Sequence, residues 1–351
     1  MTGGAGRRAL GRLVAAGVGA GAFAVARRAL DSRAPGGAAA WSRTNHAGRE
    51  VSLLGGLALG ASLGLAAPLA ARAGARPAST SGSARTSVPA PTSVPAPTSG
   101  PASGRATGRA TARIGSTSAR AGSAPARGRR RDGARTRLPL AAGLAATAAT
   151  VAGAIDDHSE RFTGLPSAQA KGLRGHLGAL ARGEVTTGAM KIAIIGAGSL
   201  AASVSLGGGR DVVRVLADTA LVAGCANLAN LFDLRPGRAL KVGGATLLPA
   251  AVGLGSRSAL PGQSVLAAAG LGAVVAALPA DLRADDMLGD TGANPLGAAC
   301  GVVLASGGSA PGRALALAGV VGLTLLSERV SFSAVIDSVP LLSAVDRAGR
   351  A

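Results

Sequence analysis

Carboxylates gather where three apolar segments of this chain end. Asp156 and Asp157 close an uncharged run of 18 residues that begins at Leu138, Asp233 follows a later run, and three further aspartates lie between 285 and 290. A helix of that length, at about 1.5 Å per residue, approaches the ~30 Å hydrocarbon core of a bilayer. A carboxylate inside hydrocarbon is costly, whereas one at the helix end stays ionised at the membrane surface. The pattern predicts a membrane protein whose acidic helix ends together meet a charged, water-borne substrate.

The polar groups that lead to Asp233 share one helix face. Asn227, Asn230 and Asp233 stand at i, i+3 and i+6, which spans about 120° of a helix at ~100° per residue. This spacing suits a ligand site beside the other acidic ends, and it also suits amide hydrogen bonds between helices. Asp156 and Asp157 point about 100° apart, so one can hold a metal while the other meets a second substrate. Such a pair is also typical of a plain, solvated helix end.

The third acidic end places Asp290 between Gly289 and Gly292. Glycines allow a ligand to approach the backbone closely, and the same residues also make a plain turn. Within another apolar run, Arg214 and Asp218 are four residues apart and are expected to pair with each other.

Two other patterns are expected to carry no chemistry. Residues 192–201 resemble a dinucleotide fingerprint, but that motif requires a soluble βαβ unit and here it lies within apolar sequence. Cys225 and Cys300 fall in apolar runs and the histidines are scattered, so neither a disulfide nor a zinc site is expected.

The elements that position the acidic ends are apolar runs separated by polar loops. We predict an all-α, polytopic membrane helix bundle with about nine transmembrane helices, near residues 10–26, 51–71, 138–155, 192–207, 212–229, 239–254, 263–280, 295–307 and 312–326. Helices 1 and 2 occupy 1–72, and helices 3 to 9 with the acidic site occupy 138–330. Residues 331–351 form a C-terminal tail on the cytoplasmic side.

The segment 73–137 has a different composition. It is rich in Pro, Ser, Thr and Arg, repeats Thr-Ser-Val-Pro-Ala-Pro, and cannot bury enough apolar area to offset its chain entropy. We expect a disordered insertion. Residues 72–137 hold 13 arginines against one aspartate, and so account for +12 of the net charge of +20. Since this charge is not expected on a folded face, no nucleic-acid partner is predicted.

Nine alternating helices place every acidic exit on one side. If the first run passes from outside to inside, helices 3, 5, 7 and 9 also end inside. The loops 27–49 and 156–191, both rich in Lys and Arg, fall on that same side, which the positive-inside rule assigns to the cytoplasm. We therefore expect a multi-pass membrane protein whose active face is cytoplasmic.

Taken together, these motifs resemble a known superfamily, the polyprenyl-phosphate N-acetylhexosamine-1-phosphate transferases (glycosyltransferase family 4 type). That superfamily includes phospho-N-acetylmuramoyl-pentapeptide transferase of peptidoglycan synthesis. The resemblance covers roughly 138–297 and is carried by Gly153-Ala-Ile-Asp156-Asp157, Lys171-Gly-Leu, Asn227-x-x-Asn230-x-x-Asp233 and Gly289-Asp290-x-Gly292.

The resemblance implies a location in the bacterial inner membrane, an activity and a set of roles. A polyprenyl phosphate attacks the β-phosphorus of a UDP-amino sugar and UMP leaves, with Mg²⁺ or Mn²⁺ as cofactor and a homodimer left open. Asp156, Asp157 and Asp290 are then the catalytic residues. Asp290, Asp157 and Asp233 are the metal ligands. Asn227, Asn230, Asp233 and Lys171 hold the nucleotide and phosphate.

Two departures from the family pattern support an alternative function. The segment from Glu328 to Ala351 has no histidine, where the family has a His-rich loop and a tenth helix. Leu234-Arg235-Pro236-Gly237 replaces the family's Gly-Leu-Asp-Gly after Asp233. The alternative is a catalytically silent relative that binds lipid-linked precursors or scaffolds envelope enzymes.

Overall fold

The structure is a computed structural model that describes residues 3–45, 48–74, 126–158, 178, 182, 186–207, 211–254, 259–260, 262–307 and 309–350. Nine of its helices are long: α1 (Gly3–Ser32), α2 (Leu54–Gly74), α3 (Ala126–Asp157), α6 (Thr187–Gly207), α7 (Val212–Phe232), α8 (Arg238–Ala251), α9 (Gln263–Leu282), α10 (Gly289–Ala305) and α11 (Ala310–Ser327). The short elements are η1 (Ala38–Trp41), β1 (Ser42–Thr44), β2 (Glu50–Ser52), α12 (Phe332–Ser338) and α13 (Pro340–Arg347).

Each predicted apolar run coincides with one of the long helices. In the described part of the chain, six helices are long and apolar enough to cross a membrane: α1, α3, α6, α7, α9 and α11. The other three are shorter, since α8 has 14 residues, α10 has 17 and the apolar part of α2 is Leu54–Leu65. The prediction of an all-α multi-pass membrane bundle is confirmed at this level, whereas nine crossings stay a prediction.

Helix α10 lies at the centre of the bundle. All of its residues except Asp290 and Leu304 are buried, and it packs against α2, α7, α8 and α9. Its glycines allow close approach: a methyl group at Gly297 would collide with the carbonyl oxygen of Cys225, and one at Gly292 with the backbone of Gly56. This small-residue packing replaces the bulk of aromatic side chains, which make up only 1% of the sequence.

The structure bears on two further predictions, one about the motif at residues 192–201 and one about the Arg214–Asp218 pair. Residues 192–201 lie within helix α6, where Gly198 packs on Ala148 of α3, so the dinucleotide reading is excluded. Asp218 is buried and pairs with Arg214 at 3.4 Å, as predicted, and also with Arg313 of α11 at 3.3 Å.

The structure departs from the predicted boundaries in three places. Helix α3 begins at Ala126, inside the segment assigned to the insertion. Residues 77–129 form a separate unit, which lies almost wholly outside the described residues, so the predicted disorder is not tested. The strands β1 and β2 pair as an antiparallel hairpin in which Ser42 lies opposite Ser52, and the predicted C-terminal tail contains the helices α12 and α13.

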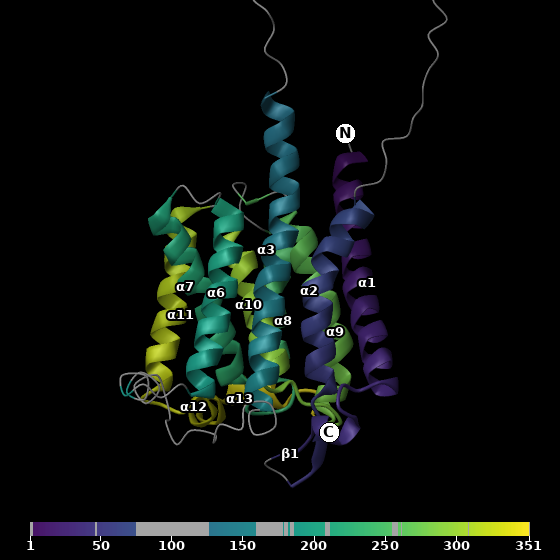
Figure 1. Ribbon diagram of the computed structural model, residues 1–351, viewed down its shortest axis with the longest axis vertical. Coiled ribbons are helices and arrows are strands. Elements are labelled where there is room, and N and C mark those ends of the chain that lie inside the picture. The colour runs from purple at the N-terminus through teal and green to yellow at the C-terminus, as the bar shows by residue number, and fades with distance from the viewer. Residues whose placement is uncertain are drawn as a thin grey trace, which may run out of the picture. The chain divides into compact units, whose positions relative to one another are not determined.

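The acidic exits lie at one end of the bundle. Figure 1 shows β1, α12, α13 and the C-terminus at the end opposite to the N-terminus, and helix α3 finishes there. Ser52 of the hairpin forms an isolated parallel bridge with Asp286 in the α9–α10 loop. The hairpin, that loop and the helix ends therefore enclose one region.

Candidate functional site

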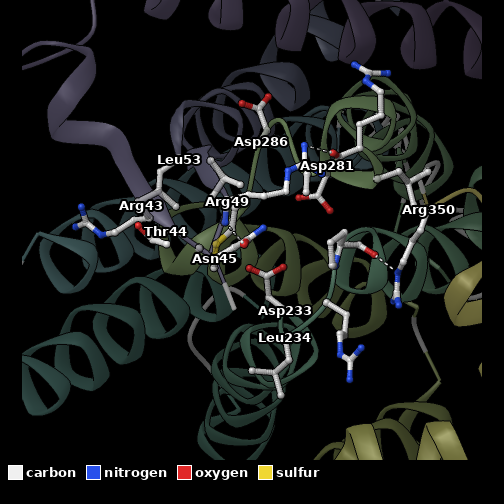
Figure 2. Close-up of a pocket in the computed structure, with 18 of the residues that line it drawn as sticks. Arg43, Thr44, Asn45, Arg49, Leu53, Asp233, Leu234, Asp281, Asp286 and Arg350 are labelled. Atoms are coloured by element: carbon white, nitrogen blue, oxygen red, sulfur yellow. Dashed lines mark hydrogen bonds between the residues drawn. The ribbon is translucent and has the colours of Figure 1, made fainter. Parts of the chain in front are cut away.

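A pocket of about 910 Å³ opens at this end of the bundle (Figure 2). Its walls come from the hairpin, the end of α3, the α7–α8 and α9–α10 loops, and the C-terminal segment. The charged residues that line it are four aspartates and five arginines: Asp157, Asp233, Asp281, Asp286, Arg43, Arg49, Arg235, Arg283 and Arg350. A pocket with both charges can bind phosphate groups on its arginines while its carboxylates bind cations or hydroxyl groups.

Asp157, the last residue of α3, caps the N-terminus of α10. Its Oδ2 accepts hydrogen bonds from the backbone N–H of Thr291 at 2.9 Å and from the Thr291 hydroxyl at 2.6 Å, and its Oδ1 accepts the N–H of Asp290 at 3.3 Å. A carboxylate here satisfies orphan donors and meets the positive end of the helix dipole. Gly289 makes this contact possible because it has φ 57° and because a Cβ there would lie 3.0 Å from the Asp157 carboxylate.

Lys191 of α6 joins two of the predicted catalytic residues. Its Nζ lies 3.3 Å from Oδ2 of Asp156 and in direct contact with Oδ2 of Asp290. All three side chains are at most 27% exposed. The acidic ends of α3 and α10 are thus brought together as predicted, with a cation between them that the sequence analysis did not identify.

Asp233 follows the last residue of α7 and projects into the pocket beside Asp281 (Figure 2). Its Oδ2 is buried and has no hydrogen-bond partner among the described residues. Burial, followed by the negative charges of Asp281 and Asp157, raises the pKa of the Asp233 carboxyl well above its ordinary value. An unpaired carboxylate oxygen facing other carboxylates is the feature of this pocket best suited to attract a cation.

The remaining predicted residues are not assembled in the pocket. Asn227 is exposed and Asn230 is half-buried on α7, and neither lines the pocket. They lie about 9 and 4.5 Å further along the helix axis from Asp233, at ~1.5 Å per residue. Asp156 and Asp290 also lie outside the pocket lining, although Gly289 belongs to it. Lys171 lies outside the described residues.

No family model, no curated protein and no solved structure matches this chain. Its chemistry must therefore be inferred from the site itself.

Several charged residues of the site were missed from the sequence. Lys191 had a detectable signal, because it is the sole charge in a helix of 21 residues, and a lone charge in an apolar helix marks a functional position. Asp281 was detectable as the first carboxylate after an apolar run. Asp286 was included in the third acidic end, but its pairing with Arg27 of α1, through two hydrogen bonds of 2.8 and 3.1 Å, was not predicted, because nothing in the sequence links these residues.

The predicted metal site was tested against the positions of its ligands. Within the described ranges, no three His, Cys, Asp or Glu side chains form a metal-binding group. Asp157 accepts hydrogen bonds from the start of α10, and Asp290 pairs with Lys191. Among the three predicted metal ligands, Asp233 therefore keeps a buried oxygen without a partner. Mg²⁺ commonly takes one or two carboxylates and completes its shell with substrate phosphates and water. Asp233 is therefore the predicted ligand that would hold such an ion in this pocket.

Proposed function

We propose that this protein is a membrane phosphotransferase that moves a sugar-1-phosphate from a UDP-amino sugar to polyprenyl phosphate and releases UMP. The observation that carries the proposal is the convergence of the acidic ends of α3, α7 and α10 at one end of an apolar bundle, beside a pocket lined by arginines. Such a site can bring a water-borne, anionic substrate together with the phosphate of a lipid-linked substrate at the membrane surface. Cell-envelope glycan synthesis at the cytoplasmic face of a bacterial inner membrane is the setting this predicts.

The pocket has the size and charge for a nucleotide sugar. Ligand pockets usually measure ~300–1,000 Å³, and this one measures about 910 Å³. Arg43 and Arg49 come from the hairpin segment, Arg283 from the α9–α10 loop and Arg350 from the C-terminal segment, so the arginines enter from different walls. Guanidinium groups bind phosphate oxygens in pairs, which orients a diphosphate as well as binding it.

The reaction requires positioning and charge neutralisation more than proton transfer. An oxygen of the lipid phosphate attacks the β-phosphorus of the UDP-amino sugar, and the bond from that phosphorus to the UMP oxygen breaks. A phosphate monoester with a second pKa near ~6 is largely dianionic at pH 7, so it attacks without a general base. Lys191 lies outside the pocket lining and contacts Asp156 and Asp290, so its role would be to hold the ends of α3 and α10 together beside the site. Mg²⁺, held by Asp233 and the substrate phosphates, would supply further neutralisation of the diphosphate charge.

One observation favours the catalytically silent alternative. Asp156, Asp157 and Asp290 each have a partner within the protein, and these partners hold the helix ends together. A protein that kept these residues for stability alone would still bind a lipid-linked precursor in the arginine-lined pocket. It would release no UMP.

The deciding experiment is an assay of the full chain in lipid nanodiscs with polyprenyl phosphate, Mg²⁺ and a panel of UDP-amino sugars. The proposal predicts release of UMP with at least one sugar and loss of that release in Asp233→Asn. The matched control is Glu328→Gln, the same carboxylate-to-amide change at an exposed residue that follows α11 and does not line the pocket. Binding of a lipid-linked precursor without release of UMP from any sugar would support the silent alternative.

A further inference from the structure

Helix α13 has its polar residues buried and its apolar residues exposed. Ser343 and Asp346 are 8% and 6% exposed, whereas Leu341, Leu342 and Val345 are 73%, 45% and 55% exposed. A surface helix of a soluble domain shows the opposite pattern, with the apolar stripe toward the protein. The solvent-side face of α13 is therefore suited to an apolar environment.

The polar face of α13 is fixed to the bundle. Arg238 of α8 donates two hydrogen bonds to the Asp346 carboxylate, at 2.7 and 2.9 Å, and both side chains are at most 5% exposed. Lys241 Nζ donates to the carbonyl oxygens of Val345, Asp346 and Ala348 at 2.7 to 3.0 Å. Rotating the apolar face inward would break these contacts and leave charges buried without partners, so α13 keeps its apolar face outward.

The exposed apolar face continues the surface of a membrane helix. Val320 is the only buried residue of α11, and Leu325 and Leu326 near its end are 63% and 44% exposed. The exposed apolar side chains continue along the chain through Val330, Val335 and Val339 to Leu341. Figure 1 shows α12 and α13 at the end of the bundle where α11 finishes. The surface that α11 offers to lipid thus leads directly to α13.

We propose that α13 is an interfacial helix that docks on the lipid bilayer surface. Leu341, Leu342 and Val345 enter the boundary between headgroups and acyl chains, and the exposed Arg329 and Arg347 meet lipid phosphates at the rim. Because Arg350 lies three residues beyond α13 and lines the pocket, this docking holds one pocket wall at the membrane surface.

The test measures the environment of the apolar face in the full chain. A nitroxide is attached to Leu341→Cys, or to Val345→Cys as a second position, in bilayers of phosphatidylcholine and phosphatidylglycerol. Asp337→Cys is the matched control, since the Asp337 side chain on neighbouring α12 is 43% exposed and polar. The thiols of Cys225 and Cys300 are buried, and wild-type protein gives the labelling background.

The ratio of collisions with oxygen to collisions with a water-soluble nickel complex reports lipid contact. We expect this ratio to be several-fold higher at Leu341 and Val345 than at Asp337. Equal access of the nickel complex to all three positions would overturn the proposal, because the face would then lie in water. Shielding of Leu341 and Val345 from both reagents would also overturn it, because another protein surface would then cover α13.

Discussion

Asp157 caps helix α10 by accepting both the backbone N–H and the side-chain hydroxyl of Thr291, across 134 residues of sequence. The end of one helix thereby fixes the beginning of the central helix. The same carboxylate lines the pocket, so one residue serves both the fold and the site. Substitutions there will change stability and activity together, whereas other site residues allow the two to be separated.

The first prediction concerns this cap. Asp157→Ala should lower the free energy of unfolding by about 1–2 kcal/mol, the usual loss when a helix N-terminus loses its capping side chain. Thermal unfolding in detergent, followed by circular dichroism, measures the change. Thr291→Val removes one donor and leaves the backbone bond, so its effect should be smaller. Equal stability of wild type and Asp157→Ala would show that the cap contributes nothing.

The second prediction separates activity from stability at Asp233. The pKa of this carboxyl is raised by burial and by Asp281 and Asp157, so the native protein binds its proton more tightly than the unfolded chain. Stability therefore falls as pH rises from the ordinary value of 3.8 through the raised pKa. At pH 7, Asp233→Asn should unfold at a temperature equal to or above that of wild type. On the proposed function it should also release UMP about 100-fold more slowly, the scale of losing a preorganised charged group. An Asp233→Asn protein that is less stable than wild type but releases UMP at the same rate would contradict both the stability prediction and the activity prediction.

The third prediction concerns the ion cluster at Lys191. Lys191→Met removes the cation between Asp156 and Asp290 and leaves two partly buried carboxylates facing each other. We expect the free energy of unfolding to fall by up to ~3 kcal/mol. This is the low end for a broken buried pair, because the side chains retain some exposure. Adding Asp290→Asn should restore part of it, since the second substitution removes the unpaired charge. A double-mutant cycle of thermal unfolding gives the coupling energy between Lys191 and Asp290. If the effects of the two substitutions on stability simply add, the two residues do not interact and the ion cluster is ruled out.

The fourth prediction is a pH dependence at the C-terminal segment. Burial alone raises the pKa of Asp346, but its hydrogen bonds with Arg238 and Arg350 outweigh that effect and lower the pKa from 3.8 to about 2. The pair therefore stabilises the folded protein fully above pH ~4, and this stability is lost as pH falls through the folded pKa. A shift of this size corresponds to about 2 kcal/mol.

Hydrogen exchange of residues 332–350 is the appropriate measurement. In wild type, protection should decrease as pH falls from 4 to 2, while Asp346→Asn should be poorly protected at every pH. Since exchange has its own pH dependence, the comparison is the ratio of the two proteins at each pH. A ratio that stays constant over this range would refute the assignment.

The sequence by itself determined the class of fold and the end of the bundle at which the site lies. Apolar runs of helical length can satisfy their backbone hydrogen bonds internally in lipid, so the run lengths already specify a helical bundle. Alternation of direction then places the exits of α3, α7 and α9 at the same end, which the ion cluster and the pocket show. The Arg214–Asp218 pair was also predictable, because residues four apart on a helix face each other.

Tertiary structure decided which carboxylates remain free. Asp156, Asp157, Asp233 and Asp290 are alike in sequence, each standing at the end of an apolar run. In the packed bundle Asp157 caps the N-terminus of α10 and Asp290 pairs with Lys191, whereas an oxygen of Asp233 has no partner among the described residues. It also brings the arginines of the hairpin and of the C-terminal segment into the same pocket. Sequence spacing could not reveal these pairings, because the partners lie 99 and 134 residues apart. Such partners are brought together by how the helices pack, and that packing depends on contacts along their whole length.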